Sequence, residues 1–160
     1  MTCKLMCQHF ASLMRYAPQQ AFWSWLSEQG KETPDPAKER EKWQPPLAGF
    51  TPKARCCFYN AQALALFHGA EYWEGYAMTE LGIPIEHAWN VKNGRIIDLT
   101  WKDAATEYFG VKVPTDYIRK RWLADKISSS LASRYFIEEL YKKGLYKGAE
   151  SSQATSSNQK

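Results

Sequence analysis

Three side chains suited to thiol chemistry occur along the chain in the order Cys57, His87 and Asp98. A cysteine attacks as its thiolate, so it needs a base beside it, and a third group must fix the orientation of that base. Histidine and aspartate commonly take these two roles. These residue types therefore predict a catalytic triad, which requires elements that bring three separated positions together.

A tight hairpin is predicted to join the histidine to the aspartate. Two runs rich in apolar and β-branched residues flank the dipeptide Asn93-Gly94: residues 85–92 and 95–101. Asn-Gly favours a two-residue type I′ turn, because both central positions need positive φ. Such a turn pairs Lys92 with Arg95, Val91 with Ile96, and Asn90 with Ile97. His87 and Asp98 then become diagonal neighbours on one face. A register shifted by one residue would separate them.

A helix is predicted to carry the cysteine. Residues 57–67 contain no proline or glycine and have alanine and leucine at their centre, a composition that favours a helix. Gly69 is placed to end this helix. Cys57 would open it, where unpaired backbone N–H groups stabilise a thiolate and can also hold an oxyanion.

The adjacent thiol and two other histidines compete for these roles. Cys56 is an alternative nucleophile, but neighbours on a helix point about 100° apart, so only one can face the hairpin. His68 shares the helical face of Cys57 but lies about 16 Å farther along, at about 1.5 Å per residue. His9 stays open as a base, although no local pattern supports it. His87 is therefore the favoured base.

Several nearby side chains have two interpretations. Asn60 follows the cysteine by one helical turn and could line the site or cap a loop. Trp89 shares the face of the His–Asp pair and could shield it from water or only pack. Glu74 and Glu86 could form a carboxylate pair, but Glu86 falls on the strand face opposite His87. That placement favours solvent exposure or a structural ion pair.

The order of a cysteine on a helix and a histidine and aspartate on strands resembles the transglutaminase-like branch of the papain-like cysteine enzymes. Two segments look like the His-Ala-Trp and Asp-Pro-Thr-Trp segments of that branch: His87-Ala88-Trp89 and Asp98-Leu99-Thr100-Trp101. Leucine stands where the family often has proline. Small bacterial and phage proteins share further similar segments: Cys57-Phe58-Tyr59-Asn60-Ala61, Glu74-Gly75-Tyr76-Ala77 and Tyr108-Phe109-Gly110-Val111. The resemblance covers roughly residues 53–117.

This resemblance implies a papain/transglutaminase-like α+β core and a Cys57-His87-Asp98 triad. Papain-like enzymes also place a glutamine upstream of the nucleophile as an oxyanion donor, and Gln44 is the candidate here. The superfamily includes proteases, amidases, acyltransferases and crosslinking enzymes, and some members have lost activity. The implied function is a cysteine-dependent hydrolase or acyltransferase that acts on an amide or peptide-type bond through a thioester at Cys57. The sequence does not identify the substrate, and it does not decide whether water or an amine accepts the acyl group.

The length of 160 residues suits one domain with a sizeable core. We predict a single α+β domain over residues 1–147, with the nucleophile helix packed on a small antiparallel sheet and extra helices at both ends. The other predicted elements are helices within 3–29, an extended connection over 30–48, strands over 72–78 and 108–113, and helices over 115–127 and 129–143. Residues 148–160 are rich in serine, glutamine and lysine and are predicted to be disordered.

Composition predicts a reduced, cytoplasmic protein without a cofactor. The four cysteines include an adjacent pair and show no secretory disulfide framework. Gln8 and His9 interrupt the N-terminal apolar stretch, so no signal peptide is predicted, and no run approaches a membrane span. Cys3, Cys7 and His9 lack a fourth ligand, so no metal site is predicted.

The charge distribution leaves a different class of function open. Residues 117–147 hold eight lysines or arginines and three acidic residues, whereas the whole chain has a net charge of +4. Such a basic face is usually solvated, but it could bind an acidic partner or nucleic acid. The alternative to an enzyme is therefore a catalytically silent interaction module, for example a phage-encoded one that binds a host protein or nucleic acid.

Overall fold

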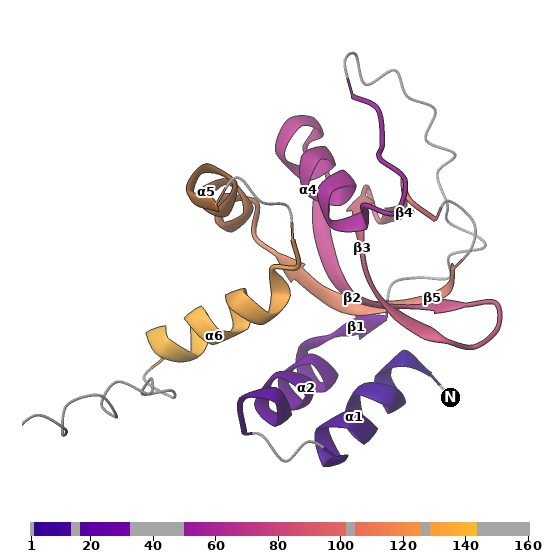
Figure 1. Ribbon diagram of the computed structural model, residues 1–160, viewed down its shortest axis with the longest axis vertical. Coiled ribbons are helices and arrows are strands. Elements are labelled where there is room, and N and C mark those ends of the chain that lie inside the picture. The colour runs from indigo at the N-terminus through magenta and orange to yellow at the C-terminus, as the bar shows by residue number, and fades with distance from the viewer. Residues whose placement is uncertain (1, 14–16, 33–49, 102–104, 126–128, 144–160) are drawn as a thin grey trace, which may run out of the picture.

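The computed structural model describes residues 2–13, 17–32, 50–101, 105–125 and 129–143 (Figure 1). Within these ranges the helices are α1 (Cys3–Leu13), α2 (Ala17–Gln29), α4 (Cys57–His68), α5 (Thr115–Asp125) and α6 (Ala132–Lys142). The strands are β1 (Lys31–Glu32), β2 (Glu71–Thr79), β3 (Pro84–Lys92), β4 (Arg95–Ile97) and β5 (Ala105–Val113). The predicted α+β class is confirmed.

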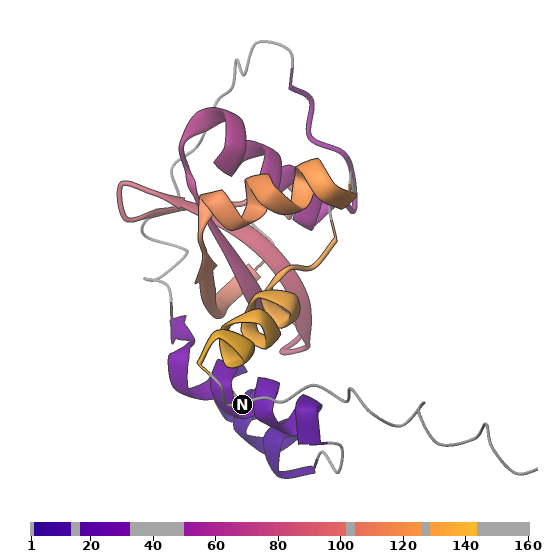
Figure 2. The same cartoon turned by 90° about the vertical axis from the view of Figure 1, so that its left-hand side faces the viewer.

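The strands form one antiparallel sheet in the order β1-β5-β2-β3-β4. The long strands β2, β3 and β5 make its centre, while the short β1 and β4 lie at opposite edges. Figures 1 and 2 show α4 and α5 beside one part of the sheet and α1 and α2 beside another. The two edges of the sheet therefore have different helical surroundings.

The helices bury one face of the sheet in two adjoining clusters. Around α4 and α5, the buried residues include Tyr72, Ala88 and Val113, together with Ala61 and Ile118 from the helices. Around α1 and α2, they include Met78, Phe109 and Val111 from the strands, and Cys3, Met6, Cys7 and Leu26 from the helices. The α4 helix runs through this core, since residues 60–65 are all buried.

The opposite face carries a smaller cluster rich in aromatic residues. Its buried members are Ala77, Trp89, Val91, Ile96, Ala105 and Tyr108, with Trp73 and Trp101 packed against them. The strand register puts these side chains together, because Ala77 lies opposite Tyr108 and Val91 lies opposite Ile96. His87 is on this face as well, opposite Gly75.

The β3–β4 hairpin has the predicted turn and register. Asn93 and Gly94 have φ values of 54° and 76°, the positive angles that a type I′ turn needs. The three pairs are those predicted: Lys92 with Arg95, Val91 with Ile96, and Asn90 with Ile97. The predicted second arm over 95–101 is too long, because β4 ends at Ile97. Asp98 then accepts hydrogen bonds from backbone N–H groups two and three residues ahead, which turns the chain.

The helix predicted over residues 57–67 is confirmed and extends one residue farther, to His68. Gly69 ends it with φ of 66°, the left-handed conformation that glycine adopts at low cost. Other boundaries differ from the predictions: β5 begins earlier, at Ala105, and α6 begins later, at Ala132. The strand β1 was not predicted, and its two residues pair with Gly110 and Phe109.

Some predictions fall outside the described ranges, among them the tail over 148–160 and most of the connection over 30–48. Among the helices that the structure describes, none is long and apolar enough to cross a membrane.

Candidate active site

Cys57 is the first residue of α4, and its side chain is half-buried. Cys56 precedes it as the N-cap and is exposed. The first helical hydrogen bond runs from Asn60 N to Cys56 O at 2.9 Å. The N–H groups of residues 57–59 therefore precede the helical hydrogen-bond ladder and carry the partial positive charge of the helix start. Cys57 lies where backbone N–H groups can meet an anion.

Asn60 fixes the segment that leads into this helix. Its buried side chain accepts a hydrogen bond from Lys53 N and donates one to Lys53 O, each at 2.8 Å. Its Nδ2 also donates to Thr100 Oγ1 at 2.9 Å. Thr100 belongs to the turn that Asp98 holds, so Asn60 links the start of α4 to that turn. Of its two interpretations, these contacts support the one in which Asn60 secures a loop.

His87 and Asp98 form a buried pair. His87 Nε2 and Asp98 Oδ2 are 2.7 Å apart, and each side chain is 1% exposed. The same Oδ2 accepts a hydrogen bond from Tyr108 OH at 2.8 Å. The other oxygen, Oδ1, accepts the backbone N–H groups of Thr100 and Trp101 at 2.9 Å each. The carboxylate is therefore held on both oxygens, and it holds the imidazole in turn.

The thiol completes this arrangement, because Cys57 lies close enough to His87 to help raise the pKa of its ring. Since Nε2 of the ring faces Asp98, Nδ1 is the nitrogen left for the thiol. The fold thus brings together the three side chains singled out in the sequence, in the order thiol, imidazole, carboxylate. The helix α4 supplies the first, β3 the second, and the turn that directly follows β4 the third.

The electrostatics of the site favour a charged imidazole. Burial of the His87 ring lowers its pKa, but the hydrogen bonds and negative charges of Asp98 and Cys57 outweigh burial and raise the pKa of His87 to about 9. Burial also opposes the charge of Asp98. The hydrogen bond and charge of His87, with donors from Trp101 and Tyr108, nevertheless hold the pKa of Asp98 below its usual range. A proton taken up by His87 is therefore retained on a ring next to a fixed negative charge.

The aromatic ring stacked on His87 belongs to Trp101. The two ring centroids are 4.3 Å apart, with 27° between the planes. Trp101 also borders a cavity of about 310 Å³ together with residues 79–81. Trp89 is fully buried, lies 5.0 Å from the Tyr108 ring and closely approaches Gly110, where a Cβ would be 2.6 Å from its indole. These contacts support the interpretation that Trp89 only packs. The ring that covers His87 is that of Trp101.

Sequence reasoning missed the contributions of Tyr108 and Trp101 to this site. Period-2 alternation can assign Tyr108 to one face of its strand, but its contact with Asp98 depends on the pairing of β5 with β2, which is not local. Trp101 stands three residues beyond Asp98, and only the turn after β4 folds it back over His87. Neither contact has a signal in residue spacing alone.

Glu74 is a second buried carboxylate, and the sequence did not predict its structural role. It accepts hydrogen bonds from Tyr72 OH at 2.6 Å, from Ser130 Oγ, and from the backbone N–H groups of Leu131 and Ala132 at 2.8 Å and 3.0 Å. It therefore holds the first turn of α6. Burial raises the pKa of Glu74, although these hydrogen bonds oppose the shift. Glu86 is exposed, so the two glutamates do not form a carboxylate pair.

The other candidates lie apart from the site or outside the described ranges. Gln44 falls within residues 33–49, which the structure does not describe. His9 is exposed on α1, and His68 is the last residue of α4. Cys3 and Cys7 are buried residues of α1, and burial raises the pKa of each thiol to about 12. The described residues contain no group of three or more side chains that could hold a metal ion.

The basic C-terminal region is partly compensated by acidic side chains. Arg119 pairs with Asp116 at 2.7 Å on α5, and Arg121 lies 4.0 Å from Glu138 of α6. An acidic or nucleic-acid partner for residues 117–147 stays a prediction.

In comparisons with known proteins, no family model, no curated protein and no solved structure matches this chain. The functional argument therefore depends on the geometry of the site.

Proposed function

We propose that this protein is a cysteine-dependent hydrolase or acyltransferase that forms a thioester at Cys57. The observation that carries the proposal is the buried His87–Asp98 pair, with Nε2 and Oδ2 2.7 Å apart, beside the thiol of Cys57, which helps to raise the pKa of His87. This arrangement gives the thiol a base, and it gives that base, once protonated, a fixed negative charge beside it. The position of Cys57 at the start of α4 adds backbone donors for an oxyanion.

The proposed reaction uses these groups in order. His87 takes the thiol proton, and the Cys57 sulfur attacks the carbonyl carbon of an amide or peptide-type bond. The N–H at Cys57 stabilises the negative charge on the carbonyl oxygen, with Gln44 proposed as a second donor. His87 then gives its proton to the leaving amine, and the thioester stays on Cys57. Asp98 orients the ring and stabilises its charged form throughout. Water or an amine, deprotonated by His87, releases the acyl group.

The finer fold assignment is proposed with the function. A papain/transglutaminase-like core is supported by the nucleophile helix α4 packed across an antiparallel sheet, with the histidine on β3 and the aspartate at the end of β4. Membership of the transglutaminase-like branch remains a proposal based on the resemblance of the His-Ala-Trp and Asp-x-Thr-Trp segments.

The test is covalent modification of the thiol, which needs no knowledge of the natural substrate. The protein is treated with iodoacetamide near neutral pH, and the labelled residue is identified by mass spectrometry. Cys57→Ala should abolish rapid labelling. Cys56→Ala is the matched control, because it removes the adjacent and more exposed thiol and should leave rapid labelling intact. Rapid labelling that follows Cys56 would overturn the assignment.

Turnover requires a second measurement. An activated ester such as p-nitrophenyl acetate should release p-nitrophenol and leave an acetyl group on Cys57. Faster release with a primary amine in the buffer, together with an acetylated amine as product, would identify an acyltransferase. Release that depends on water alone would identify a hydrolase. An alkylated but unacylated Cys57 would favour the catalytically silent alternative.

A further inference from the structure

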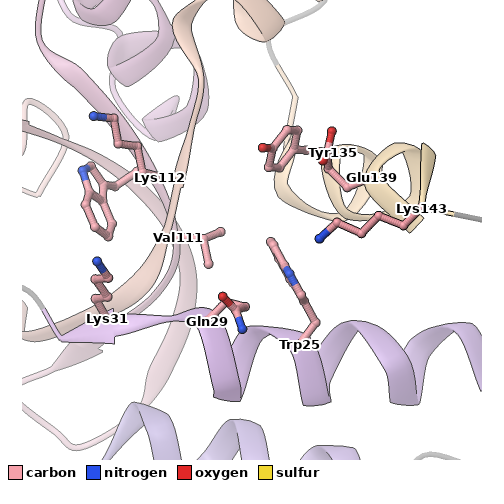
Figure 3. Close-up of a pocket in the computed structure, with 9 residues that line it drawn as sticks. Trp25, Gln29, Lys31, Val111, Lys112, Tyr135, Glu139 and Lys143 are labelled. Atoms are coloured by element: carbon pink, nitrogen blue, oxygen red, sulfur yellow. The ribbon is translucent and has the colours of Figure 1, made fainter. Parts of the chain in front are cut away.

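A second cavity lies at the opposite edge of the sheet from the thiol. It has a volume of about 350 Å³ and is lined by residues of α2, β1, β2, β5 and the end of α6 (Figure 3). The strand order places the β1–β5 edge across the sheet from the β3–β4 edge that carries His87 and Asp98. The candidate active site therefore does not account for this cavity.

The shortness of β1 opens the cavity. Its two residues pair only with Gly110 and Phe109, so the last three residues of β5 extend beyond it. The chain turns from α2 into β1 at Gly30, whose N–H donates to Leu26 O at 2.8 Å. Because β1 begins only at Lys31, no strand covers residues 111–113 of β5 on this edge, and long side chains of α2 and of the end of α6 line the gap that is left there.

Three aromatic residues form the apolar walls, and their rings are held in place by neighbours. Trp25 packs on Phe136 with centroids 4.9 Å apart. The Trp73 indole N–H donates to Glu71 Oε2 at 3.1 Å. Tyr135 packs on Tyr117 at 5.2 Å. Because these rings are already fixed, they offer flat surfaces at little entropic cost to a ligand.

The charges around the cavity leave an excess of positive charge. The lining includes Lys31, Lys112 and Lys143, and one acidic residue, Glu139. Lys112 is paired with Glu71, and Glu139 is paired with Lys142 at 2.6 Å. Within the described residues, Lys31 and Lys143 have no ion-pair partner. In Figure 3 the Lys143 side chain extends from α6 toward Trp25, and Lys31 comes from the β1 side.

We propose that this cavity binds a small organic anion in which a flat ring adjoins a phosphate or carboxylate group. The ring would lie against Trp25 and Tyr135, and the anionic group would meet Lys143, which extends toward Trp25, while Lys31 adds positive charge from the other side of the cavity (Figure 3). The volume falls within the range of small-molecule sites, roughly 300–1,000 Å³. Gln29, also at the wall, offers an amide for the polar edge of the ring.

Adenosine monophosphate is a suitable probe, because it combines a flat ring with a phosphate. The indole N–H signals in an NMR spectrum would be followed during titration, and the signals of Trp25 and Trp73 would be identified from Trp→Phe variants. Both signals should shift to saturation with adenosine monophosphate. Adenosine alone and inorganic phosphate alone should each bind more weakly, and added salt should weaken the nucleotide.

Charge removal gives the deciding comparison. Lys143→Gln should weaken binding of adenosine monophosphate about fivefold, and Lys31→Gln should weaken it less. Lys120→Gln is the matched control, because it removes the same charge from an exposed position of α5 outside the cavity. Cys57→Ala should bind the probe unchanged, which separates this proposal from the proposed reaction. Equal affinities for all variants, or no shift at Trp25 and Trp73, would overturn it.

Discussion

Asp98 and Glu74 are both buried carboxylates with several hydrogen-bond donors, yet their pKa values move in opposite directions. The pKa of Asp98 is lowered, whereas that of Glu74 is raised. Each accepts backbone N–H groups and a tyrosine hydroxyl. The difference lies in one partner, since Asp98 faces an imidazole that can become a cation, and the donors around Glu74 are all neutral.

This contrast separates two uses of a buried acid. Neutral donors satisfy the oxygens of Glu74 without cancelling the cost of its buried charge, so the group serves to fix the start of α6. A cation beside Asp98 offsets that cost and ties the charge of the acid to the protonation of His87. We expect changes at Asp98 to alter thiol reactivity, and changes at Glu74 to alter stability.

The largest effect is expected from Asp98→Asn. The amide keeps the size of the side chain but removes the negative charge, so His87 loses its countercharge and can adopt the wrong tautomer. The rate of Cys57 alkylation near neutral pH should fall about 100-fold or more. The change is measured as the rate of iodoacetamide labelling, with intact fold checked by circular dichroism.

Two variants control this experiment. Glu74→Gln makes the same acid-to-amide change in the other buried carboxylate and should leave the labelling rate within about twofold of wild type. The double variant Asp98→Asn/His87→Ala should be little slower than either single variant, because members of one catalytic unit are not additive. Equal labelling in wild type and Asp98→Asn would remove the basis for a triad.

Removal of the other carboxylate should act on stability. Glu74→Ala leaves a cavity and deprives Tyr72, Ser130 and the first N–H groups of α6 of their acceptor. The free energy of unfolding should fall by about 3–4 kcal/mol. Urea denaturation measures this loss, and the labelling rate of the remaining folded protein should stay near wild type. A slow labelling rate in folded Glu74→Ala would show that the two carboxylates are coupled.

The hairpin and the nucleophile helix could be predicted from local signals, and the surroundings of Glu74 could not. Asn93-Gly94 sets its turn through positive φ at two adjacent residues. Gly69 ends α4 through positive φ at a single residue. The His87–Asp98 contact follows from that turn by counting. By contrast, Glu74 meets Leu131 across 57 residues of sequence, and Tyr108 meets Asp98 only after β5 pairs with β2. Contacts of this kind depend on strand order, which residue spacing does not encode.

The pH dependence of stability tests the His87–Asp98 pair, for which Glu74 has no counterpart. The pKa of folded His87 is raised to about 9, above its usual value near 6.5. Its contribution to stability is therefore fully present below about pH 6.5 and is lost as the pH rises through about 9. The free energy of unfolding should drop by about 2–3 kcal/mol across this interval. Urea titrations from pH 6 to pH 10 would measure it.

His87→Gln provides the reference for this measurement, because it keeps a polar side chain at the position and removes the titration. The drop between pH 6.5 and 9 should be absent in His87→Gln and should persist in Glu74→Gln, where the His–Asp pair is intact. An identical drop in His87→Gln would assign the pH dependence to other groups.

The smallest effect on stability is expected from strain in the turn that positions Asp98. Gly94 has φ of 76°, and a Cβ there would meet no atom within 4 Å, so Gly94→Val introduces backbone strain without a clash. The cost should be about 1–2 kcal/mol. Gly69→Val is the matched control, since Gly69 has φ of 66° and equally open space at the far end of α4. Both variants should lose similar stability in urea, but only Gly94→Val should slow alkylation of Cys57, because only that turn sets the His87–Asp98 register. Slowing by both variants would mean that thiol reactivity follows overall stability, and the distinction between the two carboxylates would then fail.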